Sequence, residues 1–276
     1  MSSRKPLKRI GIYAAAILVF VVMIFPIYTV VLMSVQHETD IRSKDINLIP
    51  TYLTGEHYQQ IFKPDHIVQL KTALKNSLIV SASSGLLAVA AGVLAAYALA
   101  RERIKFGRTI LYSMVSIYIF PTVLFVIPIF ILFVNFGLND TFAGVILAYT
   151  AFVLPFMIWV LKGFVEAVNQ EIEEAALMDG CGIGRLFFDI YAPLLRPGMA
   201  AAFLFSFILA WIEFLTPLIF TSSLKMLTVE IGLYRGTTNI QIGQMAGAAV
   251  VSMLPVFLIV AFFQKQIVQV VVGGDK

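Results

Sequence analysis

Residues 174–180 read Glu-Ala-Ala-Leu-Met-Asp-Gly, and they lie in a polar segment between two long apolar runs. Each flanking run is long enough to cross a bilayer, which takes roughly 20 helical residues. Because lipid offers no water to bond the backbone, such runs must be helical. The polar segment between them therefore lies outside the lipid, and its contacts decide what the chain does.

The composition places the chain among membrane proteins. Of its 276 residues, 59% are hydrophobic and 13% are charged, whereas soluble domains carry about 25% charged residues. The mean hydropathy is +0.90. The net charge of +4 is typical of loops that orient a membrane protein and does not call for a nucleic acid. The single cysteine, Cys181, excludes an internal disulfide.

Six apolar runs predict an all-α membrane protein with six transmembrane helices. They form a single domain, residues 10–268, between a tail of residues 1–9 and a tail of residues 269–276, with a helix-turn-helix hairpin at 166–193 between the fourth and fifth spans. The first run is too long for a signal peptide, so we expect it to stay uncleaved. The predicted spans are 10–35, 73–100, 108–134, 142–163, 197–222 and 244–268.

Two features inside the spans predict how the helices pack. Small side chains recur every fourth residue on the second span, which lets another helix approach closely. Prolines interrupt four of the other spans, and each is expected to kink its helix. The small residues are Ala88, Gly92, Ala96 and Ala100, and the prolines are Pro121, Pro128, Pro155, Pro217 and Pro255.

The orientation follows from the basic residues of the short loops. Residues 101–108 carry four Lys or Arg side chains, whereas residues 135–141 carry none. Cytoplasmic loops are enriched in such residues. Both termini are therefore predicted to be cytoplasmic, and the hairpin at 166–193 lies on the same side.

The hairpin is predicted to hold two short helices. Helix formers fill residues 166–178, and Gly180 and Gly182 end that helix. A second helix follows at 183–190, and we expect Pro193 and Pro197 to stop it before the fifth span. The charged side chains of the hairpin are mainly acidic, and acidic helices are repelled by an anionic inner leaflet. We therefore expect the hairpin to bind in a groove on a partner protein rather than on the lipid surface.

At this point the sequence resembles a known family. Glu-Ala-Ala, three residues, Gly, nine residues, Ile, and a Pro three residues later is the signature of permease subunits of binding-protein-dependent ABC importers. The match runs from Glu174 through Gly180 and Ile190 to Pro193, with Ala192 where the family usually has Leu. The six spans, the long loop after the first span and the end at 263–269 look like the smaller, second permease of the maltose/trehalose/glycerol-phosphate carbohydrate branch.

The resemblance implies partners and a location. The chain would form a heterodimer with a second six-span permease in the lipid bilayer of a bacterial or archaeal plasma (inner) membrane. Two copies of a cytoplasmic ABC ATPase would carry ATP and Mg²⁺, while this chain binds no cofactor and is not an enzyme. An extracytoplasmic binding protein would deliver a sugar or related polyol. The ATPase-coupling residues would be Glu174, Ala175, Ala176, Asp179, Gly180, Ile190 and Pro193.

Glu213 is an ionisable residue within the predicted fifth span. Such a group costs about 2.5–3.5 kcal/mol at membrane depth, so it should face a cavity or a polar partner. Family members often have Asn where this chain has Ile212. Glu213 either contacts solute, with aromatic faces from Trp211, Phe214 and Tyr149, or bonds a neighbouring subunit.

The outer segments hold weaker candidates. The resemblance implies that the loop before the last span contacts the binding protein, and its candidates are Tyr234, Arg235 and Asn239. The long loop at 36–72 is expected to hold a short helix near 58–62. Its histidines, His37, His57 and His66, have no ligand-like spacing, so no metal site is predicted.

Two other functions compete with import. An ion-coupled secondary transporter is the alternative, but such proteins often have repeated halves and paired intramembrane charges, and only Glu213 is seen here. An intramembrane enzyme would need clustered reactive groups at membrane depth. The chain also lacks a phosphate-binding Gly-x-x-x-x-Gly-Lys-Ser/Thr motif, so any ATP hydrolysis must come from a partner.

Overall fold

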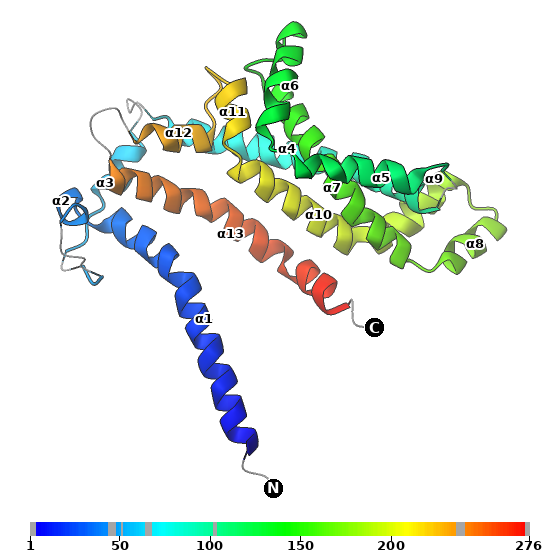
Figure 1. Ribbon diagram of the computed structural model, residues 1–276, viewed down its shortest axis with the longest axis horizontal. Helices are drawn as coiled ribbons and strands as arrows, with labels where there is room; N and C mark the ends of the chain where they lie inside the picture. Colours follow the sequence, from blue (N-terminus) through cyan, green and yellow to red (C-terminus); the bar gives the residue numbers. More distant parts are fainter. Residues whose placement is uncertain are drawn as a thin grey trace. The chain divides into compact units, whose positions relative to one another are not determined.

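The computed structural model describes residues 4–43, 48–50, 52–63, 68–101, 104–235 and 241–273, and it is 82% helix. Figure 1 shows the course of the chain. Its elements are α1 (Arg4–Val35), α2 (Glu38–Ile41), α3 (Glu56–Ile61), α4 (Leu70–Arg101), α5 (Gly107–Val115), η1 (Ser116–Ile119), α6 (Val123–Asn135), α7 (Phe142–Ala167), α8 (Gln170–Met178), α9 (Ile183–Arg185), η2 (Leu186–Tyr191), α10 (Ala192–Ile212), α11 (Leu215–Phe220), α12 (Leu227–Leu233) and α13 (Ile242–Gly273).

The chain divides into two compact units. Unit 1 comprises residues 1–71 and 230–254, and unit 2 comprises residues 72–229 and 255–276. The hairpin and the half-buried Glu213 both belong to unit 2. The arrangement of the candidate sites can therefore be described within unit 2 alone.

Among the residues that the structure describes, five helices are long and apolar enough to cross a membrane. The predicted third span is instead a pair of helices with a break at residues 120–122, where the chain bends by 103°. The predicted fifth span is wrong at its end, because α10 stops at Ile212 and Pro217 lies in the separate helix α11. The five are Gly11–Val35, Leu70–Arg101, Phe142–Ala167, Ile183–Ile212 and Ile242–Gln264.

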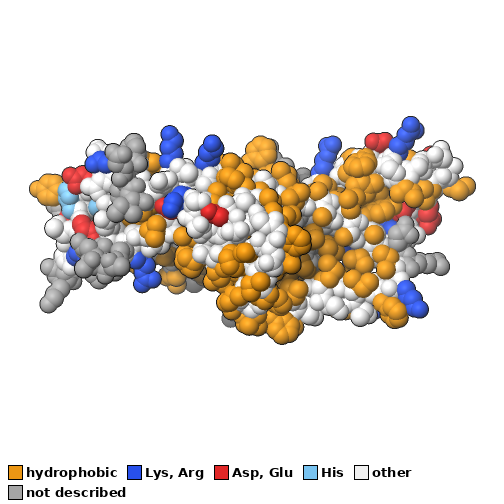
Figure 2. Space-filling model, turned by 90° about the horizontal axis from the view of Figure 1, so that it is seen from above, with side chains coloured by type: hydrophobic (Ala, Val, Ile, Leu, Met, Phe, Trp, Pro, Cys, Tyr) orange, Lys and Arg blue, Asp and Glu red, His pale blue; other side chains and the backbone are white. Residues whose placement is uncertain are grey.

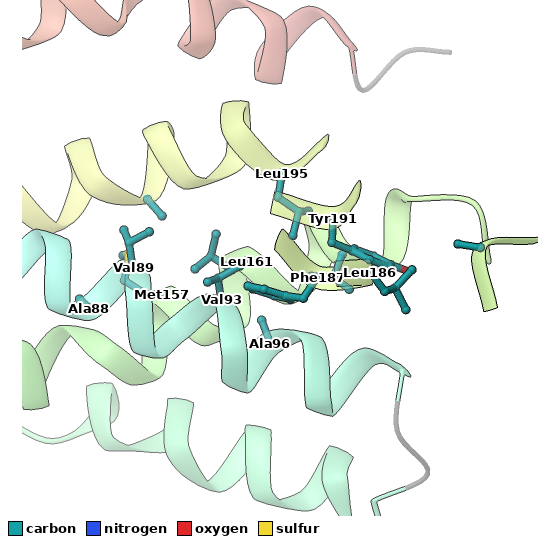
Figure 3. Close-up of a cluster of buried hydrophobic side chains, with 13 residues drawn as sticks. Ala88, Val89, Val93, Ala96, Met157, Leu161, Leu186, Phe187, Tyr191 and Leu195 are labelled. Atoms are coloured by element: carbon teal, nitrogen blue, oxygen red, sulfur yellow. The ribbon is translucent and has the colours of Figure 1, made fainter. Parts of the chain in front are cut away.

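The core of unit 2 forms where α4, α7 and α10 meet, and Figure 3 shows its buried side chains. The predicted small-residue stripe of α4 lies at this junction. A Cβ on Gly92 would be 3.2 Å from Leu161 Cδ1 of α7, so a larger residue there would require the Leu161 side chain to shift. Ala88 and Ala96 are fully buried on the same face. The close helix approach predicted for the stripe is confirmed.

The outward face of α4 is apolar as well. Leu86 and Leu94 are 63% and 55% exposed, although they belong to a helix whose other face is buried. Figure 2 shows apolar side chains spread over the visible surface of unit 2, with charged side chains near the end that carries α8. An apolar exterior on a packed helix is the pattern of a surface that faces lipid or another membrane protein.

Unit 1 is held together by polar contacts at the ends of its helices. Tyr58 of α3 is 2.7 Å from the Ser34 hydroxyl of α1, and His57 Nε2 lies 2.8 Å from the Gln36 carbonyl oxygen. The Glu38 carboxylate accepts the first two backbone N–H groups of α13, at 3.2 and 3.0 Å. The short helix expected near 58–62 is confirmed as α3, and His66 lies outside the described residues.

Candidate functional site

The first helix of the hairpin begins with a side-chain cap. Asn169 adopts an extended backbone and its side chain accepts the N–H of Glu171 at 3.1 Å. This satisfies one of the backbone donors that every helix leaves open at its start. Residues 166 and 167, predicted to belong to this helix, complete α7 instead. Helix α8 is thus separate from α7 and has its own capped start.

The end of α8 forms a Schellman motif. Gly180 has a φ of +80°, and its N–H donates to the Leu177 carbonyl at 3.0 Å. The N–H of Cys181 donates to the Ala176 carbonyl at 3.0 Å. This pair of bonds satisfies carbonyls that the helix end leaves open, and it needs a left-handed residue where glycine carries no penalty. The predicted glycine C-cap is confirmed at Gly180.

The signature residues divide between the outer surface of the hairpin and its base. Glu174, Ala175, Asp179 and Gly180 are exposed. Ala176 is only 9% exposed and packs in the hydrophobic core. Its small side chain therefore lets α8 pack closely against the base of the hairpin. Ile190 and Pro193 are partly buried, and Ile190 packs against the same core.

Large apolar side chains also lie on the hairpin surface. Met178, at the end of α8, is 88% exposed, and Phe188 in η2 is 69% exposed. Exposed apolar groups beside acidic ones are typical of a surface that another protein covers. The set comprises Ile172, Leu177, Met178, Ile183 and Phe188.

The second half of the hairpin runs directly into the membrane helix. The prediction that Pro193 and Pro197 stop the helix is wrong, because α9, η2 and α10 are consecutive and Ile183–Ile212 reads as one span. Pro193 sits in the first turn of α10, where a missing N–H costs little. The π-helical turn η2 precedes it and places Leu186, Phe187 and Tyr191 in the core (Figure 3).

A small cavity of about 150 Å³ brings Tyr149 and Glu213 together in unit 2. The hydroxyls of Tyr149 and Thr216 are buried there without a hydrogen-bond partner among the described residues. The Tyr149 hydroxyl and the Glu213 carboxylate both belong to residues that line this cavity. Buried polar groups of this kind are usually satisfied by water or a ligand. The cavity is lined by Tyr118, Thr122, Tyr149, Phe152, Val153, Leu209, Ala210, Glu213 and Thr216.

The other two aromatic candidates lie away from this cavity. Trp211 is 5% exposed and stacks on Phe207, with ring centroids 5.5 Å apart and an interplanar angle of 17°. Phe214 is 45% exposed. Neither lines the cavity, so the structure joins two of the four path candidates and separates the other two.

Glu213 has a structural role that the sequence analysis did not anticipate. It ends α10, and its carboxylate accepts the N–H groups of Leu215 and Thr216 at 3.0 and 2.9 Å. Its backbone carbonyl accepts the Thr228 hydroxyl at 2.8 Å. Glu213 therefore caps α11 across a break in the helix, which a sequence pattern of Glu two residues before a short apolar helix could have suggested.

The candidates for outer contacts have unequal access. Tyr234 is 2% exposed, and burial, reinforced by the Glu230 carboxylate, raises the pKa of Tyr234 to about 12. A buried phenol does not offer a surface contact in this conformation. Arg235 is exposed, and Asn239 lies outside the described residues.

Asp140 joins the loop before α7 to the segment after α11. Its carboxylate accepts the N–H groups of Ser222, Ser223 and Leu224 at 2.9–3.1 Å and also the two serine hydroxyls. Burial alone would raise the pKa of Asp140, but these hydrogen bonds outweigh it and hold the pKa well below its usual range. Sequence analysis missed this clamp because its partners are more than 80 residues away.

Within the described ranges, no three His, Cys, Asp or Glu side chains lie close enough together to hold a metal ion. Unit 2 thus presents an exposed acidic and apolar surface at the hairpin, and a small, mainly apolar cavity between helices with the Glu213 carboxylate in its wall. Neither is a constellation of nucleophile, base and oxyanion donors.

Comparison with known proteins gives a consistent picture. Residues 88–272 match the family described as binding-protein-dependent transport system inner membrane component. The chain is 34% identical to the inner membrane ABC transporter permease protein YcjP of Escherichia coli, covering 100% of this chain and 99% of that protein. It is 34% identical to the diacetylchitobiose uptake system permease protein NgcG of Streptomyces coelicolor, covering 92% and 84%.

Two further similarities extend this picture. The trehalose transport system permease protein SugB of Mycobacterium tuberculosis is 33% identical over 84% of this chain and 85% of that protein. A chain of a bacterial ABC transporter involved in the import of the acidic polysaccharide alginate has a TM-score of 0.77 at 20% identity, covering 96% and 98%. None of these relatives is named as an ion-coupled transporter, so that alternative finds no support here.

Proposed function

Because the chain belongs to the family of binding-protein-dependent transport system inner membrane components, we propose that it forms half of a membrane path for a sugar or related polyol. A second six-span permease supplies the other half, and an extracytoplasmic binding protein delivers the solute. Two copies of a cytoplasmic ATPase, which hold ATP and Mg²⁺, drive the cycle. Two relatives, named as uptake systems for diacetylchitobiose and trehalose, support a carbohydrate as the solute.

The proposed topology has six spans and two cytoplasmic termini. Five long apolar helices and the bent pair formed by α5, η1 and α6 make six if the pair crosses once. The basic residues at 101–108 then lie on the cytoplasmic side together with the hairpin. Only 6% of the most apolar stretch of α1 is buried within the chain. Helix α1 is therefore suited to pack on lipid or on the second permease.

The hairpin is the proposed coupling element to the ATPase. This proposal rests on the outer surface of α8, the helix that carries the signature residues. That surface is both acidic and apolar, because Glu174 and Asp179 are exposed beside Met178. A lipid surface with anionic headgroups would repel the carboxylates. A protein cleft with basic or amide groups and an apolar floor would match both the carboxylates and the apolar side chains of this surface. Gly180 sets the direction of the turn, while Ala176, Ile190 and Pro193 support the base.

The cavity around Glu213 is the proposed point of contact with the solute. Its buried hydroxyls and the adjacent carboxylate could exchange hydrogen bonds with sugar hydroxyls or with the water that accompanies them. Tyr149 remains the candidate for an aromatic face there. For the binding protein, Arg235 remains the exposed contact candidate.

The test uses the whole complex, purified through a tag on this chain and reconstituted in liposomes with its partners. Glu174→Lys and Gly180→Asp should leave the complex inserted and assembled but uncouple it, so that ATP hydrolysis no longer drives solute uptake. The matched controls are Glu56→Lys, another exposed acidic residue, and Gly137→Asp, another open glycine with positive φ at +67°. Normal uptake in either hairpin variant, or a wild-type chain that brings down no ATPase, would refute the proposal.

A further inference from the structure

A buried ion pair lies beneath the hairpin, on the side opposite its exposed surface. Arg101 is the last residue of α4 and Glu173 is in α8, and Arg101 Nε lies 3.3 Å from Glu173 Oε2. Their side chains are only 11% and 14% exposed. The contact is ionic, because Nε is not at hydrogen-bond geometry. Glu173 thus faces inward, whereas its neighbour Glu174 faces outward.

Two phenols complete the surroundings of Glu173. The Tyr97 hydroxyl of α4 donates to Oε1 at 2.9 Å, and the Tyr191 hydroxyl of η2 donates to Oε2 at 2.7 Å. The two rings also pack edge to face, with centroids 5.0 Å apart. Hydrogen bonds to an ionised acceptor are roughly twice as strong as neutral ones. A single carboxylate of α8 therefore binds both the end of α4 and the start of the fifth membrane helix.

Arg101 extends the same cluster to α7. Its guanidinium donates to the carbonyl of Val165 at 2.9 Å and also to the carbonyl of Val168, the residue that ends α7. It also lies 5.6 Å above the Tyr191 ring. A planar guanidinium can make these contacts at once, whereas a lysine ammonium cannot reproduce the fork. The cluster thus connects α4, α7, α8 and η2.

The energetics favour a positioning role over a purely stabilising one. Removing two charges from water costs several kcal/mol per ion, which their attraction recovers only with good geometry and further hydrogen bonds. Well-packed apolar residues would stabilise the same junction at least as well. The charged cluster adds geometric specificity, because each of its bonds fixes the position of α8 relative to a particular helix end.

We infer that Arg101 and Glu173 are positioning residues that make the hairpin move as one body with the ends of α4, α7 and α10. A force applied to the exposed surface of α8 then reaches three membrane helices at once, instead of bending the short loop at 168–169. This inference rests on the proposed coupling function of the hairpin and adds the internal joint that transmits the motion.

The test compares solute uptake per ATP hydrolysed in reconstituted complexes of equal subunit content. Glu173→Gln keeps the side-chain shape but removes the charge, and it should lower that ratio about tenfold, the effect of losing a charge-assisted hydrogen bond. The amount of ATPase that co-purifies should stay at the wild-type level. Arg101→Lys should act in the same direction, because it keeps the charge but loses the fork. The control Lys162→Gln breaks the Lys162–Glu166 pair, whose Glu166 side chain is 54% exposed, and should change the ratio by less than about twofold.

The outcomes separate this inference from the proposed function. If Glu174→Lys and Gly180→Asp uncouple the complex but Glu173→Gln and Arg101→Lys do not, the inference is wrong and the coupling role stands. If all four transport normally, both fail. If Glu173→Gln does not assemble, Tyr97→Phe decides, since it removes one hydrogen bond and keeps both charges. A ratio at the wild-type level in Tyr97→Phe would then overturn the inference, and a partial fall with full assembly would support it.

Discussion

The carboxylate of Glu213 caps α11, and this role can be separated from a role in the solute path by two substitutions. Glu213→Ala removes both acceptors of the Leu215 and Thr216 N–H groups. Glu213→Gln removes the charge and one of the two acceptors, because its amide nitrogen cannot accept an N–H, and it keeps one carbonyl oxygen at the same reach. If capping is the main role, the alanine variant must be the less stable of the two.

The expected magnitudes follow from the geometry. Loss of a helix N-cap costs about 0.5–2 kcal/mol, and a cap that satisfies two donors belongs near the upper value of about 2 kcal/mol. In Glu213→Gln one of the two N–H bonds is lost, but the cost of holding a charge at membrane depth, about 2.5–3.5 kcal/mol before any relief by the cavity, is removed. These two changes oppose each other. The glutamine variant should therefore lie within about 1 kcal/mol of wild type.

The assay is thermal unfolding of the purified complex in lipid nanodiscs, followed by uptake into proteoliposomes. A cost of about 1–2 kcal/mol corresponds to a fall of about 2–8 °C in melting temperature for a chain of this size. Leu218→Ala, at an exposed position of the same helix, is the matched control for side-chain truncation. An alanine variant as stable as wild type would refute the capping argument. A glutamine variant of normal stability with a raised KM for uptake would show that the charge serves the path.

Two further predictions concern the loops and unit 1. Asp140→Asn should lower the stability of the folded chain at neutral pH. The pKa of Asp140 is depressed in the folded state. The stability that its carboxylate contributes is therefore complete above the unfolded pKa of about 3.9 and is lost as pH falls through the folded pKa. Melting curves from pH 7 to pH 3 should show the difference from wild type shrinking only below about pH 4, and a constant difference would contradict the clamp. Gly243→Ala should disrupt unit 1, because a Cβ there would lie 2.2 Å from His57 Nε2; His57→Ala should restore the melting temperature of the double variant, and an unaltered single variant would contradict the packing.

Much of the helix content could be predicted because hydropathy reports burial in lipid directly. Runs such as 142–163 and 244–268 lie within α7 and α13, since no other backbone arrangement satisfies its polar groups in lipid. The turn at Gly180 was also predictable, because a left-handed C-cap nearly requires glycine. These are local rules, and they hold without knowledge of any partner element.

The breaks inside apolar runs could not be placed from the sequence. Pro193 was expected to stop a helix but lies in the first turn of α10, and Pro121 was expected to kink a span but lies in the break before α6. The difference is whether the missing N–H falls in the first turn of a helix or between two helices.

The candidate cavity was predictable in part. Glu213 drew attention because a charge at membrane depth must find a polar partner. Trp211, two residues earlier, was grouped with it, but positions two apart on a helix face different directions, and Trp211 stacks on Phe207 instead. Thr216 and Tyr118 were missed because only the broken helices bring them to the cavity.

The two helix breaks of unit 2 lie at the same cavity, the one that contains Glu213. Tyr118 and Thr122 come from the bend of the third predicted span, and Glu213 and Thr216 come from the break between α10 and α11; all four line the cavity. Irregular backbone at membrane depth is tolerated only where it is buried in protein or lines a water-filled space. Both breaks of unit 2 therefore line one cavity, which is the space that the proposed solute contact would use.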